Sequence, residues 1–292
     1  MRALAVLIAV TAVWGVTFVQ VKDAVALYPL FAFLAVRFAI ASCTLAPVGL
    51  RRLPSLGRGG VGAGALAGTL LGGGYLLQTA GLQRTSVSST GFITGMYVVL
   101  TPLLALMLFR VHAARTAWVG VLLATAGLAL LSGGVHADAV GGDLLVLAGA
   151  AVYSLQIVLM ERFAPVYDAI AFTLVEMLAA FAGLLVVAIL SGQLEWPQGW
   201  TVWGALLVTG VFASALAFLA QTWAQRRTTA TQTALAFSLE PVWTAFFGFT
   251  LAGDRLGRLA WVGCAVIMAG IVIAEPAAAN ALVRLVRRPR PA

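Results

Sequence analysis

Three charged side chains lie inside long apolar runs, where a charge must have a partner or face a cavity. They are Arg37, Glu176 and Glu240. A charge at the centre of a bilayer costs about 2.5–3.5 kcal/mol even on insertion scales, so a lipid-facing helix would not keep one. These side chains could recognise a charged small molecule, carry a coupling proton or form a gating ion pair. The alternative is a buried Arg–Glu pair that only fixes how the helices pack.

Polar and aromatic side chains recur at helical spacing in the same kind of apolar run. Thr94 and Tyr97 share a face of residues 87–109, and Tyr153 shares a face with Gln156. A single Ser or Thr in such a run more often bonds to its own helix or to a neighbour, so only the convergence of several faces favours a site. The candidate substrate-binding residues are Trp14, Arg37, Tyr75, Gln78, Thr94, Tyr97, Tyr153, Gln221 and Glu240, and the candidate coupling or gating residues are Arg37, Glu176 and Glu240.

The composition places these residues in a membrane protein. Of the 292 residues, 62% are hydrophobic and 10% are charged, and the mean hydropathy is +1.01. A soluble domain is about one quarter charged, and a membrane-spanning helix needs roughly 20 largely apolar residues. Ten such runs predict an all-α integral membrane protein with ten transmembrane helices, at residues 3–21, 29–48, 61–82, 87–109, 116–132, 143–159, 170–190, 202–224, 229–252 and 259–274.

The basic residues predict an orientation in the membrane. The net charge is +8, and Lys22 is the only lysine. Most basic residues fall in segments that share the cytoplasmic side if the N-terminus is cytoplasmic. The pattern therefore predicts a multi-pass protein of the plasma or inner membrane with both termini in the cytoplasm, and it argues against nucleic-acid binding. We expect residues 3–21 to be a retained first helix rather than a cleaved signal.

An internal repeat divides the chain into two halves. Residues 75–86, YLLQTAGLQRTS, recur as residues 218–229, FLAQTWAQRRTT. We expect a five-helix repeat at 1–132, an inter-repeat loop at 133–142, a second five-helix repeat at 143–276 and a basic tail on anionic lipid at 277–292.

The number of helices in each repeat has a consequence for symmetry. Because five is odd, the second repeat would enter the membrane from the opposite side, and two inverted repeats would surround a central cavity. In secondary transporters such symmetry places the substrate near the membrane midplane, between the repeats. The alternative is a duplication that serves packing only.

The prolines, histidines and cysteines of the chain give further predictions. Pro102 and Pro241 lie in equivalent runs and predict helix kinks there. No phosphate-binding loop is visible, and His112 and His136 fall in different loops, so we expect neither a cofactor nor a metal site. Cys43 and Cys264 lie in apolar runs and are interpreted as packing residues.

Several short motifs occur in the order found in one known family. They are AVWG and TF within residues 12–18, FLAVRF at 33–38, GFITG at 91–95 with Pro102, and SLEPV at 238–242. On these motifs the chain resembles the drug/metabolite transporter superfamily, in its ten-helix EamA-type branch. The resemblance implies a basket in which spans 1–4 and 6–9 surround a central cavity while spans 5 and 10 lie at the periphery. Glu176 departs from the pattern, in which a neutral polar residue is expected.

The resemblance also implies a function, because known relatives export amino acids and related small metabolites without ATP. We therefore expect a secondary transporter, not an enzyme, that exports such molecules by alternating access. One Arg and one or two Glu in an aromatic cavity would suit a zwitterion, and a proton on Glu240 or Glu176 is the candidate coupling ion. The alternatives are a multidrug or cationic-compound exporter, a passive channel, and an intramembrane enzyme or lipid-handling protein. Oligomeric state is left open.

Overall fold

The computed structural model describes residues 2–85, 87–132, 140–251 and 257–274. Most of the expected inter-repeat loop at 133–142, the basic tail at 277–292 and His136 lie outside these ranges. Within them the chain forms helices and no strand. The expectation of an all-α membrane protein is confirmed, because six helical stretches are long and apolar enough to cross a membrane, and 115–130 and 258–274 are shorter apolar helices.

The helices follow one another through short turns, as the apolar runs predict. The sixth candidate span contains a π-helical segment, Val208–Leu216, between two α-helices. The elements are α1 Arg2–Leu27, α2 Leu30–Arg52, a 3-10 turn Leu53–Leu56, α3 Gly57–Leu82, α4 Val87–Gly95, α5 Tyr97–Phe109, α6 Arg115–Ser132, α7 Val140–Phe163, α8 Ala169–Leu190, α9 Gly199–Leu207, the π-helical segment, α10 Ala217–Gln225, α11 Ala230–Phe237, α12 Glu240–Leu251 and α13 Arg258–Ala274.

Two apolar runs are divided into a pair of helices each. The run at 87–109 is interrupted at Met96, between α4 and α5, and the run at 229–252 is interrupted between α11 and α12. Pro241 is the second residue of α12, so it follows its interruption directly. Pro102 lies inside α5, C-terminal to the interruption at Met96. The proline therefore follows the break directly in the run at 229–252, whereas in the run at 87–109 it lies further along the second helix.

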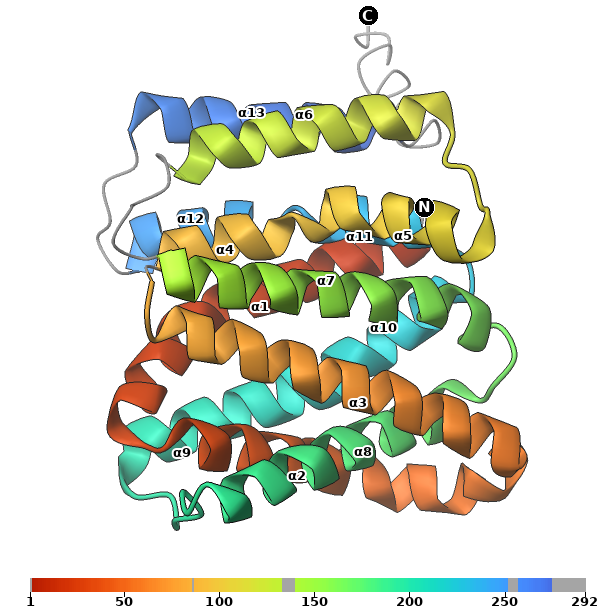
Figure 1. Ribbon diagram of the computed structural model, residues 1–292, viewed down its shortest axis with the longest axis vertical. Helices are drawn as coiled ribbons and strands as arrows, with labels where there is room; N and C mark the ends of the chain where they lie inside the picture. Colours follow the sequence, from red (N-terminus) through yellow and green to blue (C-terminus); the bar gives the residue numbers. More distant parts are fainter. Residues whose placement is uncertain (1, 86, 133–139, 252–256, 275–292) are drawn as a thin grey trace, which may run out of the picture.

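The helices lie roughly side by side across the molecule, and α6 with α13 forms a layer at one edge (Figure 1). This matches the expectation that residues 116–132 and 259–274 are peripheral. The pair packs closely through small residues: a Cβ at Gly127 would lie 2.6 Å from the Gly263 carbonyl oxygen, and one at Gly120 would lie 2.7 Å from that of Gly270.

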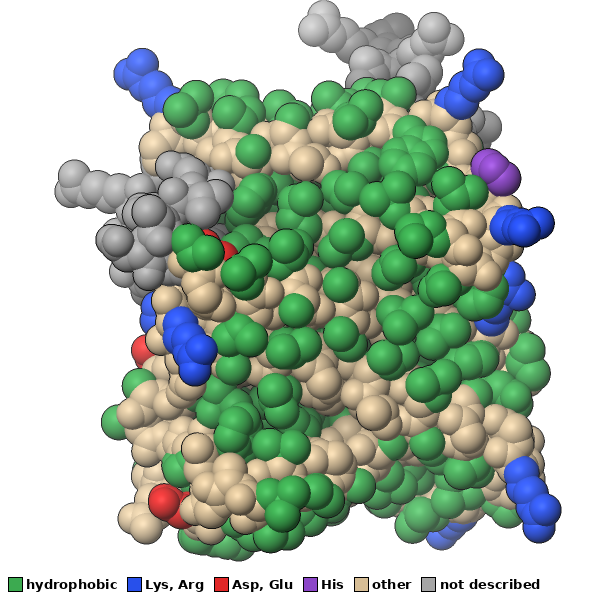
Figure 2. Space-filling view, in the orientation of Figure 1, with side chains coloured by type: hydrophobic (Ala, Val, Ile, Leu, Met, Phe, Trp, Pro, Cys, Tyr) green, Lys and Arg blue, Asp and Glu red, His purple; other side chains and the backbone are tan. Residues whose placement is uncertain are grey.

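The outer surface is suited to lipid. Large apolar side chains such as Met107, Leu122 and Leu190 are exposed. In the face shown in Figure 2, apolar side chains cover a broad band, and Lys and Arg side chains gather at the two lateral edges. Because the helices run between those edges in this view, the charged ends of the helices border the apolar band. Polar side chains buried beneath this band must then be satisfied inside the protein.

Candidate functional site

A cavity lies among α1, α3, α4, α5, α7, α10, α11 and α12. Eight of the nine residues expected to bind substrate line it, and five further residues complete the wall. The lining residues are Trp14, Leu71, Tyr75, Gln78, Thr94, Tyr97, Tyr153, Gln156, Ile157, Phe218, Gln221, Phe237 and Glu240. Most of the lining side chains are therefore aromatic or aliphatic, and the polar groups among them are amides, hydroxyls and the carboxyl group of Glu240.

The ninth expected residue, Arg37, lines a second cavity that shares wall residues with the first. This cavity extends along α1 and α3 toward Val21 and Leu82. Tyr75 and Glu240 line both cavities. The guanidinium of Arg37 and the carboxyl group of Glu240 thus face one and the same space.

Arg37 is held by neutral groups. It is 3% exposed; its Nε donates to Ser214 Oγ at 2.8 Å and its Nη2 donates to Tyr75 Oη at 3.1 Å. The guanidinium carbon lies 4.4 Å from the centre of the Tyr75 ring, close enough for a cation–π contact. A guanidinium has five N–H donors, so most of its donors remain for another acceptor in the cavity.

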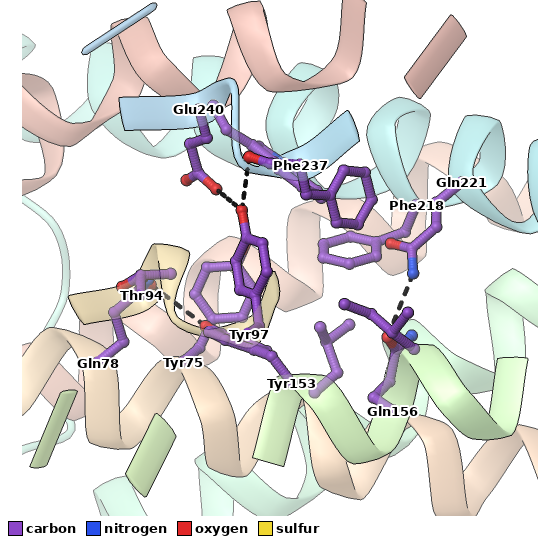
Figure 3. A pocket seen from close by; sticks show the side chains of 13 residues that line it. Tyr75, Gln78, Thr94, Tyr97, Tyr153, Gln156, Phe218, Gln221, Phe237 and Glu240 are labelled. Atoms are coloured by element: carbon purple, nitrogen blue, oxygen red, sulfur yellow. Dashed lines mark hydrogen bonds between the residues drawn. The ribbon is translucent and has the colours of Figure 1, made fainter. Parts of the chain in front are cut away.

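Glu240 stands at the first residue of α12, where the positive end of the helix dipole favours a carboxylate. It is 7% exposed, and its Oε2 lies 3.1 Å from Tyr97 Oη. The same Tyr97 hydroxyl lies 2.7 Å from the Phe237 carbonyl oxygen. Figure 3 shows this hydroxyl pointing at both acceptors. Within the described ranges one ion pair is found, and it joins Arg52 to Asp168. Glu240 therefore has no ion-pair partner among the described residues.

Glu176 does not line either cavity, contrary to the expectation that it would face a cavity or another charge. It is fully buried, and its Oε1 accepts a hydrogen bond of 2.8 Å from Gln156 Nε2. The helical period of α8 directs Glu176 toward α7, where its hydrogen-bond partner is the side-chain amide of Gln156 and not Arg37. The buried Arg–Glu pair considered from the sequence is therefore not formed between these described residues.

Glu176 is nevertheless linked to the cavity through a series of amides. Gln156 Oε1 accepts from Gln221 Nε2 at 3.2 Å, and Gln221 Nε2 also donates to Gln225 Oε1 at 2.8 Å. Gln225 Nε2 then donates to the Ile157 carbonyl at 3.0 Å. Gln156 and Gln221 line the cavity and can be reached from it, as Figure 3 shows for their mutual contact.

A second polar cluster orders the opposite wall. Gln78 Nε2 donates to Thr94 Oγ1 at 2.9 Å, and Tyr153 Oη donates to Gln78 Oε1 at 3.2 Å. Gly74, one turn before Gln78, makes room for Tyr153, because a Cβ there would lie 2.5 Å from the Tyr153 ring. These hydrogen bonds hold the side-chain amide of Gln78 in one orientation at the cavity wall.

Sequence reasoning missed several contributors. Gln156, Phe218 and Phe237 stood on the right helical faces but were not among the candidate binding residues, and Leu71 and Ile157 carry no polar signal at all. Ser214 and Gln225 act from behind the wall, on Arg37 and Gln221. The spacing of Gln225 one turn after Gln221 was the available signal for it.

The described residues hold no group of His, Cys, Asp and Glu side chains that could bind a metal ion. The arrangement is a largely apolar internal cavity with a few convergent polar groups, the kind of site in which proteins commonly hold small molecules. Together with the apolar helices, this defines a multi-pass membrane protein with an internal cavity.

The EamA-like transporter family model matches residues 1–133 and 140–274, and the chain belongs to this family. It is 30% identical over 264 residues to an uncharacterized transporter of Archaeoglobus fulgidus, covering 90% of this chain and 82% of the relative. It is 27% identical to the uncharacterized inner membrane transporter YedA of Escherichia coli, over 91% of this chain and 88% of YedA. The protein is thus a membrane transporter related to the drug/metabolite transporter superfamily.

A solved crystal structure shares the fold. It superposes with a TM-score of 0.80, covers 95% of this chain and 99% of its own, and is 21% identical in sequence.

Proposed function

We propose that this transporter is a secondary carrier that exports amino acids or closely related zwitterionic metabolites by alternating access. The observation that carries the proposal is the pair Arg37 and Glu240. Both are buried, both line one continuous space, and no ion pair joins them.

Once Glu240 has lost its proton, two opposite charges lie apart in the cavity, and this is costly unless a ligand brings their counter-charges. A separated pair matches a ligand that carries a carboxylate and an ammonium group at once. The Arg37 guanidinium would receive the carboxylate with its free donors, in the forked geometry that guanidinium groups favour. The Glu240 carboxyl would receive the ammonium group, and nearby aromatic faces such as that of Trp14 would add to its attraction.

The transport cycle we propose uses ten spans arranged as two inverted repeats, 1–132 and 143–276, with both termini in the cytoplasm. The packing of the helices supports this arrangement. α3 packs on α7, and the corresponding pair, α1 with α10, is also in contact; α2 packs on α8, and α6 packs on α13, as self-symmetric pairs would. In inverted-repeat carriers the two halves rock around a fixed midplane site.

A second candidate is export of organic cations. It is favoured by the aromatic wall around Glu240, which includes Trp14, Tyr97 and Phe237. Arg37 opposes it, because a like charge in the same cavity would repel a cation that brings no anionic group.

Counterflow in proteoliposomes tests the proposal. Vesicles preloaded with single unlabelled amino acids are given the labelled counterpart, for wild type and for Arg37→Gln and Glu240→Gln. We expect saturable exchange, with the apparent affinity reduced about 10- to 100-fold in each variant, the loss typical of a charged hydrogen bond.

The matched control is Arg52→Gln, which removes an arginine from an exposed ion pair with Asp168. It should exchange as wild type does. Exchange of no amino acid by folded protein, together with exchange of an organic cation that survives Arg37→Gln, would overturn the amino-acid proposal in favour of the second candidate.

A further inference from the structure

The hydroxyl of Tyr97 has two acceptors and a single hydrogen. Its Oη lies 2.7 Å from the Phe237 carbonyl oxygen and 3.1 Å from Glu240 Oε2. A phenol hydroxyl donates one hydrogen bond. If that hydrogen goes to the carbonyl, a bond between Tyr97 Oη and Glu240 needs a hydrogen from the carboxyl group, so Glu240 must be protonated.

The Phe237 carbonyl needs this donor because of Pro241. In a continuous helix the carbonyl of residue 237 would accept from the N–H of residue 241, but proline has none. Phe237 is 2% exposed, so water does not replace the missing donor readily, and a buried carbonyl without a donor costs about 1–3 kcal/mol. The Tyr97 hydroxyl thus supplies the hydrogen-bond donor that is missing at the break between α11 and α12.

We propose that Tyr97 is a positioning residue that links the proton on Glu240 to the break between α11 and α12. With the proton bound, Glu240 donates to Tyr97 and Tyr97 donates to Phe237, so every group is satisfied. When the proton leaves into the cavity, the Tyr97 hydrogen turns to the carboxylate, because a charge-assisted bond is the stronger one. The Phe237 carbonyl then loses its donor, and the break is free to rearrange.

This inference deepens the proposed transport function and rests on it for its role, because it gives proton coupling a route into the helices. The break lies at the junction of the cavity wall with α1, α4 and α5, against which α11 and α12 pack. A change there would move Phe237 and Glu240, both of which line the cavity.

Titratable and charged groups face Glu240 from four helices. They are Tyr97 on α5, Tyr75 on α3, Tyr153 on α7 and Arg37 on α2. From α1 and α4 the described lining residues are Trp14, Thr17, Phe18, Val21 and Thr94, which do not titrate. Of the titrating groups, Tyr97 is the one that also contacts the backbone at the break.

The test restores the missing donor. Pro241→Ala gives residue 241 an N–H that can donate to the Phe237 carbonyl, so Tyr97 is no longer needed there. The deprotonated state of Glu240 then loses its penalty. We expect the pH at which half of the Glu240 carboxyl groups are protonated to fall by about one pH unit, the equivalent of one hydrogen bond.

The same change in a Tyr97→Phe background should have no effect, because the hydroxyl that connects carbonyl and carboxyl is gone. The four proteins form a double-mutant cycle that isolates the link. Pro102→Ala is the matched control: it also restores an N–H in a membrane helix, but at a position C-terminal to the other break, and it should leave the midpoint unchanged.

The readout is the infrared absorption of protonated carboxyl groups in purified protein, assigned to Glu240 by subtraction of Glu240→Gln. This measurement needs no substrate, so it stays informative even if amino-acid exchange fails and the proposed function falls. A Pro241→Ala midpoint equal to that of wild type, or an equal shift in the Tyr97→Phe background, overturns the inference. If Tyr97→Phe does not fold, the shift in Pro241→Ala alone decides. The pH profile of counterflow should follow the same midpoints.

Discussion

The indole of Trp14 donates a hydrogen bond of 2.8 Å to the carbonyl oxygen of Ala213, which joins α1 to the π-helical segment between α9 and α10. The next residue of that segment, Ser214, accepts from Arg37. π-Helical turns leave carbonyls without their usual partners and recur at functional sites. Here the unusual turn presents its groups to two residues of the cavity, so the shape of the cavity depends on it.

Trp14→Phe should therefore weaken both stability and exchange. The change keeps an aromatic ring beside Phe218 and Phe237, whose ring centres lie 5.4 and 4.9 Å from that of Trp14, but leaves the Ala213 carbonyl without its donor. We expect a loss of about 1–3 kcal/mol in the free energy of unfolding. Thermal or denaturant unfolding in detergent measures it.

Trp200→Phe is the control for this change, because Trp200 is 86% exposed. Equal stability of the two variants would contradict the role of the indole hydrogen bond.

The contact between Gln156 and Glu176 predicts an asymmetric response to substitution. Gln156→Ala removes the donor from the fully buried Glu176 carboxyl and should lower the unfolding free energy by about 1–3 kcal/mol. Glu176→Gln keeps the shape and an oxygen acceptor, so it should fold nearly as well as wild type. If Gln156→Ala were as stable as Glu176→Gln, the amide would not be what holds the carboxyl group.

Gly68 on α3 predicts a steric effect of a single methyl group. A Cβ there would overlap the Glu176 carbonyl oxygen and lie 2.8 Å from Ala179 Cβ, and neither backbone can yield easily. Gly68→Ala should therefore push α3 away from α8 and destabilise the protein, an overpacking effect of about 1–3 kcal/mol.

The same helix supplies the control. A Cβ at Gly73 would meet nothing within 4 Å, so Gly73→Ala should be neutral, or stabilising by up to about 1 kcal/mol from helix propensity. Melting temperatures of the two variants give the comparison, and a destabilised Gly73→Ala beside a neutral Gly68→Ala would refute the packing of α3 on α8.

Much of the cavity could be predicted from the sequence, for a physical reason. Lipid excludes charges and amides from its side of a helix, so residues such as Arg37, Gln78 and Glu240 could only face inward. Their helical spacing then placed Tyr75 and Tyr97 on the same side. The membrane thus makes polar residues in apolar runs far more informative than they are in a soluble protein.

The remainder depended on packing that no local pattern encodes. Glu176 faces inward as expected, but whether it meets a cavity or an amide depends on where α7 lies. Nothing in the apolar sequence of residues 208–216 predicts a π-helical turn. That turn places Gly210 against Ile40, where a Cβ would lie 2.7 Å from the Ile40 side chain, and only the assembled helices create this constraint.

The break at Met96 was likewise not predicted at that residue. A proline weakens the helix before it, but the position at which the helix yields is set by its neighbours. At Pro241 the Tyr97 hydroxyl stabilises the freed carbonyl directly.

The central claim is that Arg37 and Glu240 together recognise a zwitterion, and ligand analogues test it most directly. Inhibition of counterflow is measured for one exchanged amino acid, for the amine that lacks its carboxylate and for the acid that lacks its amino group. Wild type should prefer the amino acid about 10-fold or more over each analogue, as expected for one charged contact. Arg37→Gln should abolish the preference over the amine, and Glu240→Gln the preference over the acid. Equal inhibition by all three compounds in wild type, unchanged in both variants, would contradict the claim.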